Sequence, residues 1–188
     1  MRRIKIYAVT SMEGYISRRD GDIDWILELD NPMETDYGLR DFYDGIGTVL
    51  MNRNYYLLLR GYDLCFSVME RPTVIITEGL HESPAIPGVE YMQARGNDYT
   101  AVLERIRALK ETEGGDIWCA GDNKLIWALL DADLVDEIIL TMLPVTIGGG
   151  AKLFPDTSHE TRWHTGNRKY YDNGVIQITY RPDRRGVN

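Results

Sequence analysis

Short apolar segments alternate with stretches of helical periodicity along most of this chain. The segment 48–51, Thr-Val-Leu-Met, is almost entirely apolar, as expected of a strand that is covered on both faces. A helix with Asn52 as its N-cap is predicted to follow directly and to run to about Leu59. Alternation of this kind is typical of α/β proteins built on a mainly parallel sheet.

The same two signals predict the remaining elements. Segments rich in β-formers predict strands at 4–9, 73–77, 89–91, 116–120 and 137–143. Apolar residues at helical spacing predict helices at 22–29, 35–43, 124–130 and from Asp98 to the Gly114–Gly115 pair, with Asp22 and Asp98 as N-caps. Segments 163–171 and 175–180 form a predicted hairpin around Asp172-Asn173-Gly174. The predicted fold class is therefore α/β, a mainly parallel central sheet flanked by helices, with an antiparallel C-terminal hairpin.

No linker long enough to separate two cores interrupts this pattern, and 188 residues suit one hydrophobic core. We therefore expect residues 1–188 to form a single domain. The two cysteines, Cys65 and Cys119, and the three histidines show no metal-ligand spacing, so no metal site is predicted. Few cysteines without a pattern fit a reducing cytoplasm, which is the predicted location.

The charge balance narrows the classes of partner. Lys and Arg number 21 while Asp and Glu number 29, which gives a net charge of −8. We do not expect so acidic a chain to bind nucleic acid or an anionic membrane, although one local positive site would suffice for a phosphate-bearing small molecule. No stretch approaches the roughly 20 apolar residues that a membrane helix requires.

Ligands of open α/β sheets bind beyond the carboxyl ends of the strands, and three such ends carry unusual residues. Segment 11–16 follows the first strand. In segment 51–55 a strand becomes a helix, whose first N–H groups attract anions and where Arg53 adds a charged donor. In segment 120–124 the same change occurs, and Gly121 permits a close backbone approach. Each segment taken alone has a simpler explanation. Segment 11–16 would be a plain turn, Arg53 would be a solvated side chain on a capped helix, and Asp122 would be an N-cap.

Together these segments resemble one family. Segments 116–121, 129–137 and 144–154 are similar to the strand, glycine turn, helix, Leu-Val-Asp-Glu strand and glycine-rich loop of the dihydrofolate reductase superfamily. The match is to the branch of the C-terminal reductase domain of the bacterial riboflavin-biosynthesis deaminase-reductase and its stand-alone relatives. Segment 11–16 resembles the family's Ser-x-Asp-Gly-x-Ile opening, and Asp24-Trp25 resembles the Asp-Trp pair of the stand-alone branch. The resemblance covers nearly the whole chain.

This resemblance implies a dihydrofolate reductase-like fold that is usually dimeric, so we expect a homodimer. It also implies an NAD(P)H-dependent reductase, which transfers a hydride, typically from NADPH, to a pterin-like or pyrimidine-like small molecule. Carried over residue by residue, Ala8 and Ile16 would flank the nicotinamide. The residues expected to meet the phosphates are Asn52, Arg53, Asn54 and Tyr55 at one helix start, and Gly121, Asp122, Asn123, Lys124 and Leu125 at the other.

The chain departs from the family's pattern around the phosphates. Thr77-Glu78 stands where the family often offers Ser and Arg to the 2′-phosphate of NADPH, and a carboxylate there repels the phosphate by on the order of 1 kcal/mol. Asp122 stands where the family usually has glycine. NADH is therefore the alternative cofactor, with Glu78 accepting a hydrogen bond from the 2′-hydroxyl. The alternative from another functional class is a non-catalytic dimer with lost or weak cofactor binding.

A reductase of this kind must also deliver a proton to a substrate nitrogen. The candidates are Asp24, then Glu13 and Asp22, which lie on the loop and helix after the first strand. A carboxyl group half-buried beside Trp25 would have a raised pKa suited to acid catalysis. The simpler alternatives are that Asp22 only caps a helix and that Asp24 faces solvent.

Overall fold

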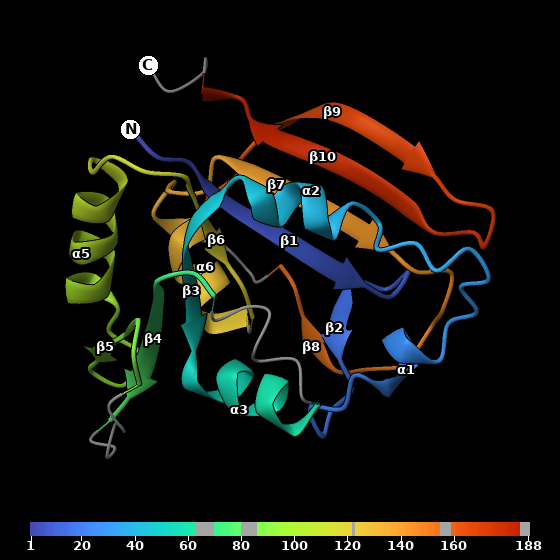
Figure 1. Cartoon of the computed structure of the whole chain (residues 1–188), viewed down its shortest axis with the longest axis horizontal. Helices are drawn as coiled ribbons and strands as arrows, with labels where there is room; N and C mark the ends of the chain where they lie inside the picture. The colour runs from blue at the N-terminus through green and yellow to red at the C-terminus, as the bar shows by residue number, and fades with distance from the viewer. Residues whose placement is uncertain (63–69, 80–85, 122, 155–158, 185–188) are drawn as a thin grey trace.

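A computed structural model of the chain describes residues 1–62, 70–79, 86–121, 123–154 and 159–184. Cys65 and Asp122 lie outside these ranges. One eight-stranded sheet, in the order β5-β4-β3-β6-β1-β7-β10-β9, runs through the molecule (Figure 1). Its strands are β1 (Ile4–Thr10), β3 (Ile46–Asn52), β4 (Thr73–Glu78), β5 (Val89–Ala94), β6 (Asp116–Cys119), β7 (Glu137–Met142), β9 (Trp163–Tyr170) and β10 (Ile176–Pro182).

The six strands from β5 to β7 are mutually parallel, and the C-terminal hairpin is antiparallel. β1 pairs in parallel with β6 on one side and with β7 on the other. β10 pairs antiparallel with β7 and with β9, as the Asn-Gly signal predicts for the final hairpin. The predicted α/β fold class is therefore confirmed, including its antiparallel end.

Helices cover both faces of this sheet. On one face lie α5 (Thr100–Lys110) and α6 (Asn123–Asp131), and on the other lie α2 (Leu39–Asp44) and α3 (Arg53–Gly61) (Figure 1). Strand residues alternate between the two sides: Ile6 and Leu50 pack toward α5 and α6, whereas Met51 packs toward α2 and α3. Two-sided burial is why these strands are apolar at nearly every position.

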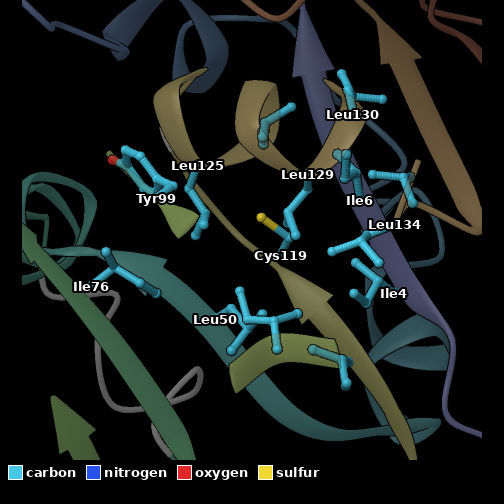
Figure 2. Close-up of a cluster of buried hydrophobic side chains, with 14 of the residues drawn as sticks. Ile4, Ile6, Leu50, Ile76, Tyr99, Cys119, Leu125, Leu129, Leu130 and Leu134 are labelled. Carbon is cyan, nitrogen blue, oxygen red and sulfur yellow. The ribbon is translucent and has the colours of Figure 1, made fainter. Parts of the chain in front are cut away.

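The larger of the two cores lies between the sheet and α6. Figure 2 shows Leu125 and Leu129 of α6 pointing at Cys119 of β6, with Ile4 and Ile6 of β1 beside them. Cys119 is 1% exposed, which confirms the predicted buried thiol. α6 is thereby fixed on the sheet, and its N-terminus lies at the carboxyl end of β6.

A small second sheet stands beyond the end of β1. It pairs β2 (Tyr15–Ser17) with β8 (Ala151–Lys152). Sequence periodicity did not predict either strand, because segments of two or three residues are too short to show one. The pairing brings the loop after β1 against the glycine-rich loop after β7.

Three predicted helix starts differ from the structure. α1 covers only Asp24–Leu27, and Ile23 rather than Asp22 is its N-cap. Asp22 instead accepts a hydrogen bond from the Asp24 N–H and one from Arg18, so it orders the turn before the helix. Asp98 likewise accepts from the N–H of Thr100, while Tyr99 is the N-cap of α5. The helix predicted at 35–43 begins at Leu39, because Asp36 accepts from the N–H groups of Gly38 and Arg40.

Other boundaries agree with the sequence predictions to within a few residues. Asn52 is the N-cap of α3 as predicted, and its side-chain oxygen accepts from the Tyr55 N–H at 2.9 Å. Strand β5 extends to Ala94, beyond the short strand predicted at 89–91. Over the described ranges, no helix has both the length and the apolar character needed to cross a membrane.

The single-domain organisation stays a prediction, which unfolding tests. Because one sheet runs from β5 to β9, the described elements should unfold cooperatively in urea. We expect the far-ultraviolet circular dichroism and tryptophan fluorescence curves to share one midpoint. Two separated midpoints would contradict a single domain.

Candidate functional site

Two helices begin side by side at the carboxyl edge of the sheet. β3 and β6 are neighbours, α3 follows β3 directly at Arg53, and α6 begins at Asn123 just after β6. The first N–H groups of a helix have no partner within it and carry its positive dipole end. Arg53 in α3 and Lys124 in α6 add positive charge to the two first turns. This edge therefore suits an anion.

A contact between Gly121 and Tyr55 holds the two helix starts together. Gly121 has a φ of +116°, and a Cβ built on it would lie 2.7 Å from the Cβ and Cγ of Tyr55. Only glycine lets the β6–α6 turn approach α3 so closely. The predicted residues Asn52, Arg53, Tyr55, Gly121 and Asn123 thus belong to one edge, with exposed Asn54 beside them.

Three predicted phosphate-binding residues have buried side chains, and a fourth lies outside the described structure. Asn52 is 6% exposed, and its side-chain oxygen accepts from the Tyr55 N–H. Leu125 is 1% exposed and packs in the core, so its side chain does not face a ligand at this edge. Thr77 is 5% exposed, and its hydroxyl donates to the Met92 carbonyl at 3.4 Å, within the sheet. Asp122 lies outside the described residues.

Glu78 ends β4 and forms a polar cluster with two side chains. The Tyr99 hydroxyl donates to Oε1 at 2.9 Å, and Lys124 Nζ donates to Oε2 at 2.8 Å. The Lys124 hydrogen bond is the main reason that the pKa of Glu78 is lowered. The carboxylate is therefore charged at neutral pH, and it links β4 to the first turn of α6.

Ala8 and Ile16 contact the same hydrophobic core, the one that lies between the sheet and α6. Ala8 is 8% exposed, and Ile16 is partly buried against that core. β1 pairs with β6 only as far as Ile6, so Ala8 lies beyond the last paired residue on that side. Both residues thus contribute to the same apolar core, Ala8 from β1 and Ile16 from β2.

Glu13 connects two loops. Its Oε2 accepts from the Ile147 N–H at 2.7 Å, and its Oε1 accepts from the Gly148 N–H at 3.2 Å. Ser11, which is fully buried, accepts hydrogen bonds from the N–H groups of Glu13 and Tyr15. Glu13, one of the three carboxylates that the sequence suggested as a proton donor, is therefore engaged in holding the glycine-rich loop.

Asp22 and Asp24 lie near each other and near the end of α3. Arg18 Nε donates to Asp22 at 2.9 Å. Burial acts against ionisation of Asp22, but hydrogen bonds from the Asp24 N–H and from Arg18 lower its pKa overall. Asp24 is exposed and accepts the Tyr62 hydroxyl at 2.6 Å, which raises the pKa of Tyr62 to about 12. Trp25 is buried but Asp24 is exposed, so the expectation of a half-buried carboxyl group was wrong and the alternative, that Asp24 faces solvent, holds.

A cleft of about 340 Å³ lies between α6, the small sheet and the glycine-rich loop. Gly150 is needed there, because a Cβ on it would lie 1.8 Å from the Ser17 carbonyl oxygen. The lining residues are Tyr15, Arg19, Asn123, Trp127, Gly149, Gly150, Ala151, Lys152 and Phe154. Sequence reasoning missed Arg19 and Trp127, because neither lies in a motif.

A larger cleft, of about 860 Å³, lies away from this candidate site. It is lined by residues where α6 and β10 end and where β7 and β9 begin, so it lies at the opposite edge of the sheet. Within the described ranges, no group of three or more His, Cys, Asp or Glu side chains lies close enough to hold a metal ion.

Residues 63–177 match the family model named "RibD C-terminal domain". The chain belongs to this family. It is 30% identical over 179 residues to the uncharacterized protein YwjB of Bacillus subtilis, covering 95% of this chain and 97% of YwjB. The match to the model confirms the resemblance drawn from segments 116–121 and 144–154.

Two solved structures share the fold. A protein of Shewanella sp. PV-4, named "Putative riboflavin biosynthesis protein", superimposes with a TM-score of 0.82 at 21% identity, covering 97% of this chain and 99% of that one. Dihydrofolate reductase from Enterococcus faecalis, complexed with NADP(H), gives a TM-score of 0.59 at 19% identity, covering 96% of each chain. The fold of this RibD C-terminal domain is therefore dihydrofolate reductase-like.

The Gly121–Tyr55 contact predicts a specific stability difference. Gly121→Ala introduces both a strained φ and a clash with the Tyr55 ring, so we expect it to lower the free energy of unfolding by about 2–4 kcal/mol. Gly79→Ala is the matched control, because Gly79 also has a positive φ of +84° but open space around its Cβ position. Gly79→Ala should lower the free energy of unfolding by about 1 kcal/mol. If urea unfolding shows the same loss of unfolding free energy for both variants, the close contact between Gly121 and Tyr55 is contradicted.

The Glu13 hydrogen bonds predict a change in loop protection. Glu13→Ala removes the acceptor for the Ile147 and Gly148 N–H groups, so these amides should exchange with deuterium faster. Glu13→Gln retains one acceptor oxygen and should show a smaller change in hydrogen exchange. If neither variant alters exchange at 146–150, Glu13 does not hold this loop.

Proposed function

We propose that this protein is a reductase that transfers a hydride from NAD(P)H to a pterin-like or pyrimidine-like small molecule. The observation that carries the proposal is the pair of helix starts, α3 and α6, held in contact by Gly121 and Tyr55 at the carboxyl edge of the sheet. A dinucleotide needs such a place for its pyrophosphate. Membership of the RibD C-terminal domain family supports the reaction class.

The residues at this edge fit a pyrophosphate. Backbone N–H groups at the two helix starts would donate to the phosphate oxygens, and Arg53 would add a charge-assisted donor. Lys124 contributes further positive charge, although its ammonium is shared with Glu78. A chain of net charge −8 thus has a local positive region.

The nicotinamide ring would lie at the end of β1, flanked by Ala8 and Ile16. When bound, the cofactor supplies the hydride. The apolar core that both residues contact would exclude water from one face of the ring. The glycine-rich loop, which Glu13 holds against the loop after β1, would close the site beside it.

Asp24 remains the first candidate to deliver the proton to the substrate. Glu13 and Asp22 are engaged by N–H donors from the loop at 147–148, from Asp24 and from Arg18, which favours structural roles for both. Asp24 is exposed and accepts a hydrogen bond from the Tyr62 hydroxyl. Asp24→Asn should therefore lower the rate of substrate reduction while leaving cofactor affinity unchanged.

A homodimer forms part of the proposal. Its support is the family resemblance together with the position of β9, which is the outermost strand of the sheet and is exposed along most of its length. Sedimentation of the full chain, compared with the mass of 21.6 kDa for one copy, tests this point.

Titration with NADPH and NADH, followed by tryptophan fluorescence, tests the proposed function. We expect at least one nucleotide to bind, and Arg53→Ala to weaken that binding about tenfold through loss of a charge-assisted contact. Arg60→Ala, in the last turn of the same helix, should leave affinity unchanged. Absence of binding by both nucleotides at millimolar concentration would favour the alternative, a non-catalytic dimer with lost or weak cofactor binding.

A further inference from the structure

The order of the strands would place the two nucleosides of a bound dinucleotide on opposite sides of β3 and β6. β1, where the nicotinamide is proposed, lies on one side of β6 and β3, and β4 lies on the other. With the pyrophosphate at the starts of α3 and α6, the second nucleoside must extend away from β1. It therefore passes over the carboxyl end of β4, where Glu78 lies.

Glu78 is positioned to meet the ribose of that nucleoside. Its ion pair with Lys124, at 2.8 Å, ties the carboxylate to the helix turn that would hold the pyrophosphate. Its side chain is 36% exposed, so a ligand can reach it. An ionised carboxyl group has about four acceptor positions, of which Tyr99 and Lys124 use two. Acceptor capacity remains for a hydroxyl donor.

The described charges at this corner do not favour an additional phosphate. Lys124 is paired with Glu78, and Arg95, which follows β5, lies near Asp98 and contributes to lowering the pKa of that residue. These four described side chains sum to zero charge. A 2′-phosphate, which is a dianion, would approach a fixed carboxylate with no excess of positive charge among them.

We propose that Glu78, held by Tyr99 and Lys124, selects a dinucleotide with a free 2′-hydroxyl, so that this protein uses NADH in preference to NADPH. The inference rests on the proposed function, because it places the dinucleotide as argued above. In the complex, the 2′-hydroxyl donates to Glu78, and Tyr99 keeps the carboxylate oriented. Glu78 is thus a specificity-determining residue.

Direct binding separates this inference from the proposed function. The dissociation constants of NADH and NADPH are measured by calorimetry on the intact protein and on Glu78→Gln. We expect the wild type to bind NADH about tenfold more tightly than NADPH. In Glu78→Gln, NADPH should gain affinity, because the carboxylate is gone and Lys124 loses its ion-pair partner. The preference should then disappear or reverse.

Two further variants control the measurement. Glu90→Gln makes the same change of charge on β5, where Glu90 is paired with Arg105, and should leave the preference unchanged. Tyr99→Phe removes one hydrogen bond but keeps the charge of Glu78, so the preference should weaken less than in Glu78→Gln.

The outcomes are distinguishable. Tighter binding of NADPH by the wild type, or an unchanged ratio in Glu78→Gln, overturns the role of Glu78 and leaves the reductase proposal standing. No binding of either nucleotide overturns both. Circular dichroism of each variant verifies that the fold is retained.

Discussion

The insertion of β1 between β6 and β7 is the pairing on which the rest of the structure depends. β1 contains residues 4–10, but its partners are residues 117–119 and 137–142. The Ile4 N–H donates to the Asp136 carboxylate, and Lys110, which is 3% exposed, is paired with the same carboxylate. The start of the chain is therefore held in place only when α5, β6 and β7 are present. Every loop of the candidate site extends from this sheet.

The site combines local positive charge with an acidic chain. The starts of α3 and α6 meet because β3 and β6 are neighbours and because Gly121 has no side chain to keep Tyr55 away. Glu78 lies next to them and is neutralised by Lys124. In the proposed complex, the choice between dinucleotides rests on a few side chains at the ends of β4 and α6, whereas the net charge of −8 argues only against larger anionic partners.

Sequence patterns predicted the buried strands well and the helix starts less well. A strand such as β3 is apolar on both sides, and this property is visible in any short window of sequence. The starts of α1, α2 and α5 depend instead on the N–H groups that Asp22, Asp36 and Asp98 bind. Each of these residues lies one or two positions before the actual N-cap. β2 and β8 exist only because they pair with each other, so their own residues carry no signal.

The candidate site also contains some features that local sequence predicts and others that depend on the fold. Asn52, with the helix it caps, and the conformational freedom of Gly121 follow from local residue chemistry. The sequence therefore predicts two strand-to-helix turns, at 52–55 and 121–125, and anion binding at these turns stays a prediction. The acidic groups could not be assigned in that way, because a carboxylate takes its role from the donors that reach it through space. In the folded chain Glu13 accepts from the loop at 147–148, Asp24 accepts from Tyr62, and Glu78 lies between Tyr99 and Lys124. Those donors lie from 21 to 135 residues away along the chain, and the folded sheet alone brings them within hydrogen-bonding distance.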